Sequence, residues 1–222
     1  MKIVIDFLNQ LALNNNKDWF DTNKNFYKEA KDCFETFTEK LIANIEGFDS
    51  TIRGLQVKDC TYRIYRDLRF SKDKTPYKTH MGAYICPNGK KSGLGGYYFH
   101  LESSSKLYLP SHLLATGVVC MPNNIINSIR EDIYTLPKEF ENCINIAKGW
   151  ELDEENKAKT VPKIFPKEAI NAEYLKLKDF LLNKKIDDDY ILSENLLERV
   201  TEEFSKTIQF KEFINRAISA ID

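Results

Sequence analysis

Residues 80–102 read HMGAYICPNGKKSGLGGYYFHLE, and this stretch predicts a pair of antiparallel strands. Aromatic and aliphatic residues dominate segments 81–86 and 95–101, whereas the connector between them is rich in Gly, Asn and Ser, which favour turns. Successive side chains of a strand point to opposite faces of a sheet, so the pairing register decides which residues share a face.

We predict that His80 pairs with His100. One face of the hairpin is then apolar and carries Met81, Ala83, Ile85, Tyr97, Phe99 and Leu101. The other face carries His80, Gly82, Tyr84, Gly96, Tyr98, His100 and Glu102. A shift of one residue would mix the two sets, so this segregation supports the register. Two of the chain's three histidines would therefore meet on the polar face.

The spacing of apolar residues changes on either side of this hairpin. Steps of three and four recur over 19–45, which is the period of a helix that Asn16 or Asp18 would cap and Gly47 would end. Helical spacing returns after Pro122, which is suited to a first helical turn. We therefore predict a single α+β domain over 1–222. It has N-terminal helices at about 1–50, a central, mostly antiparallel sheet at about 59–120, and C-terminal helices at about 122–222 packed on one sheet face.

Further elements follow from the same patterns. Besides the hairpin, we expect strands at 60–68, 106–109 and 116–121. In the last third of the chain we expect helices around 171–183, 193–205 and 207–220.

The segment before the hairpin is strongly basic. Residues 62–80 read YRIYRDLRFSKDKTPYKTH, with six Lys and Arg residues, two Asp residues, and four aromatic residues that include Phe70. Residues 58–91 hold nine Lys and Arg and three Asp, a net charge of +6, so the remainder of this −1 chain carries −7. This uneven distribution creates a local positive field and predicts a site for an anionic group.

Several motifs of the chain resemble a known family. They are the basic run at 62–80, NKDWF at 16–20, NK at 23–24, GYYFHLE at 96–102, and Met121-Pro122 before a helix. Together they resemble the uncharacterised, mainly bacterial domain of unknown function 2461 family. The resemblance covers most of the chain and implies a single soluble domain, but it implies no activity. Relatives are Gly-rich after the GYYxHxE segment, whereas this chain reads LPSHLL, so no role is carried over to that loop.

We predict an anion-binding cleft on the polar face of the sheet. The candidate catalytic residues are His80 and His100, and the candidate ligand-binding residues are Arg63, Arg66, Arg69, Lys72, Lys78 and Tyr98. Guanidinium groups bind phosphate or carboxylate through paired hydrogen bonds, and histidine exchanges protons near neutral pH. We therefore expect an anionic small molecule as the partner, held by an enzyme or by a binding module without chemistry.

Other interpretations stay open. The two histidines could be hydrogen-bonded packing on a sheet face, and Arg66 and Arg69 could hold a long connection through ion pairs. Aromatic residues interleaved with cations also suit single-stranded nucleic acid, although the acidic remainder and a pI near 6.4 weigh against it. A module that binds a protein partner is a further alternative.

We expect no cofactor and no resident metal. The chain has no Gly-x-Ser-x-Gly elbow and no phosphate-binding loop of the Gly-Lys-Ser/Thr type. A metal site built from His80, His100, Glu102 and Asp67 is disfavoured, because the neighbouring cations oppose a divalent ion.

The remaining features suggest a cytoplasmic protein that does not enter a membrane. The five cysteines match no metal or redox spacing, which is typical of reduced, buried thiols. Asp6 interrupts the first apolar run, so we expect no signal peptide. The longest uncharged stretch, 107–129, contains Pro110 and Pro122, which do not suit a membrane-spanning helix.

Overall fold

The computed structural model describes residues 1–69 and 71–220, so Phe70 lies outside the described residues. The helices are α1 (Lys2–Leu13), α2 (Lys17–Thr22), α3 (Lys24–Glu46), α4 (Val57–Cys60), α5 (Asn123–Thr135), α6 (Pro137–Ile146), α7 (Asp188–Ile191), α8 (Leu196–Ser205) and α9 (Ile208–Ser219). Two 3-10 turns are η1 (Ser50–Ile52) and η2 (Tyr174–Lys176). The strands are β1 (His80–Ile85), β2 (Gly96–Glu102), β3 (His112–Val118), β4 (Glu151–Leu152) and β5 (Phe180–Ile186).

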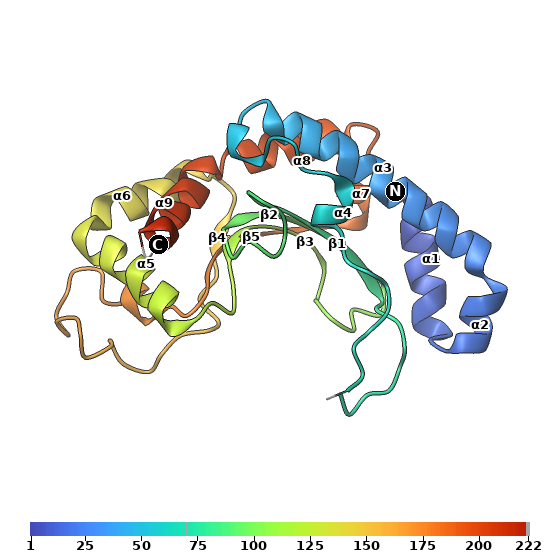
Figure 1. The fold of residues 1–222 in the computed structure, drawn as a ribbon, viewed down its shortest axis with the longest axis horizontal. Helices are drawn as coiled ribbons and strands as arrows, with labels where there is room; N and C mark the ends of the chain where they lie inside the picture. The colour runs from blue at the N-terminus through green and yellow to red at the C-terminus, as the bar shows by residue number, and fades with distance from the viewer. Residues whose placement is uncertain (70, 221–222) are drawn as a thin grey trace.

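The predicted α+β class and antiparallel sheet are confirmed. In the described part of the chain, five strands pair in the order β1-β2-β3-β5-β4, and all neighbours are antiparallel. The helices α3 and α8 run together over one face of the sheet (Figure 1). The segment between α4 and β1 and the turn between β2 and β3 descend on the other side (Figure 1). The two faces therefore have different surroundings.

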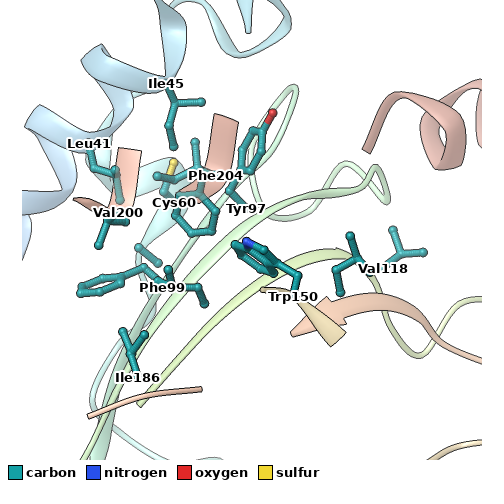
Figure 2. Close-up of a cluster of buried hydrophobic side chains, with 14 of the residues drawn as sticks. Leu41, Ile45, Cys60, Tyr97, Phe99, Val118, Trp150, Ile186, Val200 and Phe204 are labelled. Atoms are coloured by element: carbon teal, nitrogen blue, oxygen red, sulfur yellow. The ribbon is translucent and has the colours of Figure 1, made fainter. Parts of the chain in front are cut away.

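The apolar face of the sheet forms the core with α3 and α8. Tyr97, Phe99 and Leu101 of β2 are fully buried. Figure 2 shows Tyr97 and Phe99 with Leu41 of α3 and Phe204 of α8 on the same side of the sheet. Full burial of side chains of this size contributes roughly 1.5–3 kcal/mol each. The alternation along β2 is therefore fixed by packing on one face.

The predicted strand at 60–68 is wrong. The helix α4 ends at Cys60, and the chain then meets β1 through an isolated bridge between Thr61 and Ala83. Beyond this point the backbone bonds within its own loop: the backbone N–H of Arg66 donates to the carbonyl of Pro76, and that of Lys78 donates to the carbonyl of Ile64. The sheet consequently begins at His80 instead of near residue 59.

The strands predicted at 106–109 and 116–121 are misplaced. Residues 106–109 are irregular and follow a turn at 104–105, because Lys106 has a left-handed φ of 51° and Leu109 N–H donates to the Glu102 carboxylate instead of to a strand. The strand that follows, β3, ends at Val118, and Cys120 has a φ of 56°. Extended pairing cannot continue through such a residue.

The predicted helix at 171–183 is also wrong, so the region 122–222 is not helical throughout. The short η2 ends at Lys176 and is followed by β5, in which Phe180 and Leu182 are buried on one face with the period of a strand. The whole of β5 pairs with β3 and adds β4 to the edge of the sheet.

Other local predictions are confirmed. The Asn16 side chain accepts from Trp19 N–H at 2.9 Å and caps α2, and Gly47 ends α3, although the helix predicted over 19–45 is interrupted at Asn23, between α2 and α3. The helices predicted at 193–205 and 207–220 correspond to α8 and α9. All five cysteines are free, but only Cys60, Cys86 and Cys143 are buried as expected, whereas Cys33 is half-buried and Cys120 is exposed. Burial raises the pKa of the Cys60 thiol to about 12. Among the described residues, no helix is long and apolar enough to span a bilayer.

A buried ion pair joins the C-terminal helix to the N-terminal half of the chain. Lys211 of α9 contacts Asp49 beside η1, and both side chains are 1% exposed. The Tyr97 hydroxyl donates to the same carboxylate at 3.0 Å, and Lys211 also donates to Thr51. Although burial acts to raise the pKa of Asp49, hydrogen bonds from Lys211 and from Thr51 hold it below its ordinary value. The pair thus ties α9, η1 and β2 together.

Replacing Lys211 with Met should destabilise the fold by roughly 3–5 kcal/mol, because it leaves a buried carboxylate without its cation. Urea unfolding measures the change. The matched control is Lys2→Met, since the Lys2–Asp6 pair is exposed and its loss should cost less than about 1 kcal/mol. Equal and small effects of the two substitutions would contradict the role given to this pair.

Candidate functional site

The polar face of the β1–β2 hairpin is confirmed, although its exact pairing is not. His80 lies opposite Glu102, and Gly82 lies opposite His100, so the predicted pairing of the two histidines is wrong by two residues. A shift of two preserves the face of every side chain. His80 and His100 therefore share one face, with ring centroids 5.0 Å apart, while Phe99 lies on the other.

Gly82 provides the space in which the Tyr98 side chain lies. A Cβ built on Gly82 would lie 2.5 Å from the Tyr98 hydroxyl oxygen and 2.8 Å from its ring. The Tyr98 ring thus occupies the space that any other residue at position 82 would fill. A glycine inside a strand often marks such a close approach. The absent side chain lets Tyr98 reach His100.

Three side chains of β2 form a hydrogen-bonded chain on this face. The Tyr98 hydroxyl is 2.9 Å from His100 Nδ1, and His100 Nε2 is 3.2 Å from a carboxylate oxygen of Glu102. His100 is fully buried and Glu102 is 2% exposed, whereas Tyr98 is half-buried. Burial lowers the pKa of His100, although Glu102 acts to raise it. Positions i, i+2 and i+4 of a strand place these residues in a row.

Glu102 is held in place from several sides. Its carboxylate accepts from Leu109 N–H at 2.9 Å and from the backbone and hydroxyl of Ser103. Its own N–H donates to His112 Nδ1 at 2.9 Å, and His112 Nε2 is 2.8 Å from Asp188. Burial alone would raise the pKa of Glu102, but hydrogen bonds from His100 and Leu109 lower it overall. The carboxylate therefore stays ionised.

His80 is the more accessible histidine of the pair. Its ring stacks on Tyr108 with centroids 4.2 Å apart. Burial lowers the pKa of His80 to about 4, and the nearby His100, Lys78 and Arg66 add to this effect against the opposing charge of Glu102. Its Nδ1 atom is buried and has no hydrogen-bond partner among the described residues. His80 is therefore neutral at pH 7 and has an unsatisfied polar atom.

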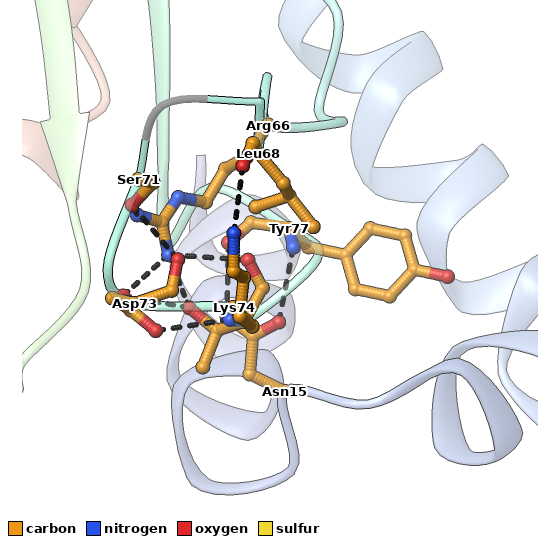
Figure 3. Close-up of polar contacts among 8 residues, drawn as sticks. Asn15, Arg66, Leu68, Ser71, Asp73, Lys74 and Tyr77 are labelled. Carbon is orange, nitrogen blue, oxygen red and sulfur yellow. Dashed lines mark hydrogen bonds and ion pairs between the residues drawn. The ribbon is translucent and has the colours of Figure 1, made fainter.

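Arg66 and Arg69 are engaged within the basic loop. Arg66 donates to Asp73, to both oxygens of Thr75 and to Ser71 (Figure 3). These hydrogen bonds hold the two sides of the loop together. Arg69 donates to both carboxylate oxygens of Asp67. These contacts match the ion-pair alternative that the sequence left open for the two arginines.

The other predicted cations are placed differently. Lys78 is half-buried, and its Nζ lies 5.5 Å from the centre of the Tyr62 ring. Burial lowers the pKa of Lys78, and the charge of Arg63 lowers it further. Arg63 and Lys72 are exposed. The structure thus brings together His80, His100 and Tyr98, with Lys78 and Arg63 at one side.

A small cavity of about 170 Å³ lies where β2 and β3 meet α1 and α7, and Glu102 of the hydrogen-bonded chain is one of the residues that line it. Its lining includes Asn9, Ser103, His112 and Asp188. Across 1–69 and 71–220, no group of three or more His, Cys, Asp or Glu side chains is arranged to hold a metal ion.

The comparisons with known proteins identify a family. The family model described as conserved hypothetical protein (DUF2461) matches residues 3–213. The chain belongs to this family. No curated protein and no solved structure gives a significant match. The predicted resemblance is therefore confirmed over nearly the whole chain, and the site must be interpreted from its own geometry.

Sequence reasoning missed three parts of the site. Glu102 was considered only as a metal ligand, yet it is the partner of His100. The signal was present, because Tyr98, His100 and Glu102 alternate along one strand. Gly82 and Tyr108 act through contacts across the sheet and from a turn, which strand spacing does not reveal.

The depressed pKa of His80 predicts a specific pH dependence of stability. Between its ordinary value of 6.5 and about 4, the unfolded chain binds a proton at this residue that the folded chain does not. The free energy of unfolding should therefore fall as the pH drops through this window. His80→Phe keeps an aromatic ring against Tyr108 and cannot titrate, so its stability relative to wild type should be higher at pH 5 than at pH 7. Urea unfolding at both pH values measures this, and an identical difference at each would refute the proposed burial of His80.

Proposed function

We propose that the polar face of the sheet binds a small molecule with an anionic group, either phosphate or carboxylate. The observation that carries the proposal is the state of His80. This neutral histidine has an unpartnered, buried Nδ1, and its pKa is lowered first by burial and then by neighbouring cations that include Lys78 and Arg66. Buried polar atoms are nearly always paired, so a group from outside the described residues is expected here.

The surrounding charges favour an anion as that group. Burial is the main cause of the lowered pKa values of Lys78 and His80, and neighbouring cations lower both further, which indicates a positive potential around them. An anion between them would relieve this repulsion. Each charge-assisted hydrogen bond to it would contribute roughly 1.5–3 kcal/mol. Lys78, Arg63 and His80 are the residues proposed to contact the anionic group, with Tyr98 contacting the rest of the ligand.

Exposed aromatic rings beside the cations supply apolar contact. Tyr62 is 47% exposed and Tyr108 is 62% exposed, and the latter stacks on His80. A ligand with a planar ring and an anionic group would match both features. The alternative, a nucleic-acid or protein-binding module, would require a longer surface, and the −7 charge outside residues 58–91 opposes nucleic acid.

The proposal is tested by calorimetric titration with phenyl phosphate, benzoate and inorganic phosphate. At least one of these probes should bind wild type, and Lys78→Gln should weaken its binding about tenfold or more, because one charge-assisted contact is lost. The control Lys138→Gln removes the same charge from the exposed surface of α6 and should change little. Absence of binding by all three probes, or equal weakening in both variants, would refute the anion site.

A further inference from the structure

We propose that Tyr98 is a nucleophile that accepts an acyl or phosphoryl group, with His100 as its base and Glu102 as the residue that positions His100. The inference rests on the proposed function in one respect, because the anionic part of the substrate would be held at His80 and Lys78. The shared chemistry is attack of a phenol oxygen on an electrophilic carbon or phosphorus centre.

The order of hydrogen bonds fixes the direction of proton transfer. An ionised carboxylate can only accept, so His100 Nε2 must carry the hydrogen that lies toward Glu102. A neutral imidazole has one N–H, and its Nδ1 is consequently an acceptor. The Tyr98 hydroxyl, 2.9 Å away, therefore donates to Nδ1. The Tyr98 oxygen therefore accepts no hydrogen bond from the imidazole of His100.

A nucleophile, a base within hydrogen-bond reach and a third group that orients the base together form the arrangement that activates weak nucleophiles. Burial raises the pKa of Tyr98 well above its ordinary value, so its phenol stays protonated without help. The same burial lowers the pKa of His100, which keeps the imidazole neutral and able to take the proton. The two shifts oppose proton transfer in the resting protein, so the proton moves to His100 only as the bond to the electrophile forms.

The neighbouring tyrosines show what a structural hydroxyl does in this protein. Tyr84, on the same face, donates toward the backbone carbonyls of Leu94 and Gly117. Tyr97, in the core, donates to Asp49. Neither contacts an imidazole. The Tyr98 hydroxyl also lies against Gly82, but its hydrogen bond to His100 is not needed for that packing.

The proposed step is balanced in atoms and charge. The Tyr98 oxygen forms a bond to the acyl carbon or to phosphorus while its proton moves to His100 Nδ1. The bond to the leaving group breaks, and the leaving group departs with the electron pair and takes the proton from His100. Water then hydrolyses the ester on Tyr98, with His100 accepting the water proton and returning it to the phenol oxygen.

The test is covalent labelling with two uncharged reagents, N-acetylimidazole for acyl transfer and diisopropyl fluorophosphate for phosphoryl transfer. Modified tyrosines are located by peptide mass spectrometry. With at least one reagent, Tyr98 should react at least tenfold faster than Tyr62 and Tyr108, although both of these are more exposed. His100→Gln should slow the reaction at Tyr98 by about 100-fold or more without changing that of Tyr108. The control Tyr84→Phe should leave the reaction at Tyr98 unchanged.

A pH profile of wild type gives a test that needs no variant. Base-assisted labelling of Tyr98 should reach a plateau once the His100 imidazole is neutral, whereas unassisted phenols keep reacting faster up to about pH 10. Glu102→Gln should slow the reaction and move this profile, as expected of a positioning residue.

The inference is overturned if Tyr98 reacts no faster than Tyr108 with either reagent, or if its profile follows that of an ordinary phenol. Because both reagents are uncharged, their reaction does not depend on the anion site. If Tyr98 is labelled as expected but no anion binds in the calorimetric titration, only the proposed anion site is contradicted. If an anion binds but Tyr98 is not labelled faster than Tyr108, only the role of Tyr98 as a nucleophile is contradicted.

Discussion

Side chains at every second position of β2 must point to the same face of the sheet, and this constraint links the core to the candidate site. Tyr97, Phe99 and Leu101 are fully buried under the helices. Because these three side chains pack on one face, Tyr98, His100 and Glu102 must point to the other face. The order and spacing of the hydrogen-bonded chain are therefore set by apolar packing on the reverse side of the same strand.

A polar row of this kind is costly to bury, and the contacts around it show how the cost is offset. Glu102 accepts hydrogen bonds from His100, Ser103 and Leu109, so its desolvated carboxylate is fully paired. His112 and Asp188 hold the backbone of the same residue from the next strand and from α7. His80 is the exception, with a buried Nδ1 that lacks a partner among the described residues. One buried polar atom without a hydrogen-bond partner, beside a chain of side chains that are hydrogen-bonded to one another, is the pattern expected of a ligand site.

The sequence was sufficient for the features that depend on period and local chemistry. The faces of the hairpin, the cap at Asn16 and the end of α3 at Gly47 all follow from neighbouring residues. Features that depend on distant partners were missed. The strand β5 looked helical because its pairing with β3 brings together residues more than sixty positions apart. Segment 60–68 looked like a strand because its aromatic and aliphatic residues suit one, while its polar groups bond inside a loop.

The same distinction applies to the site. The sequence placed His80, His100 and Tyr98 on one face, but the charge pattern could not separate Arg66, which holds the loop, from Lys78, which lies beside His80. The most direct test of the account is the tautomer of His100, observed through the nitrogen chemical shifts of its imidazole at neutral pH. We expect a neutral ring protonated at Nε2, with an Nδ1 shift that changes in Tyr98→Phe because a hydrogen bond to it is lost. A ring protonated at Nδ1, or an Nδ1 shift that Tyr98→Phe leaves unchanged, would contradict the hydrogen-bonded chain on which the site depends.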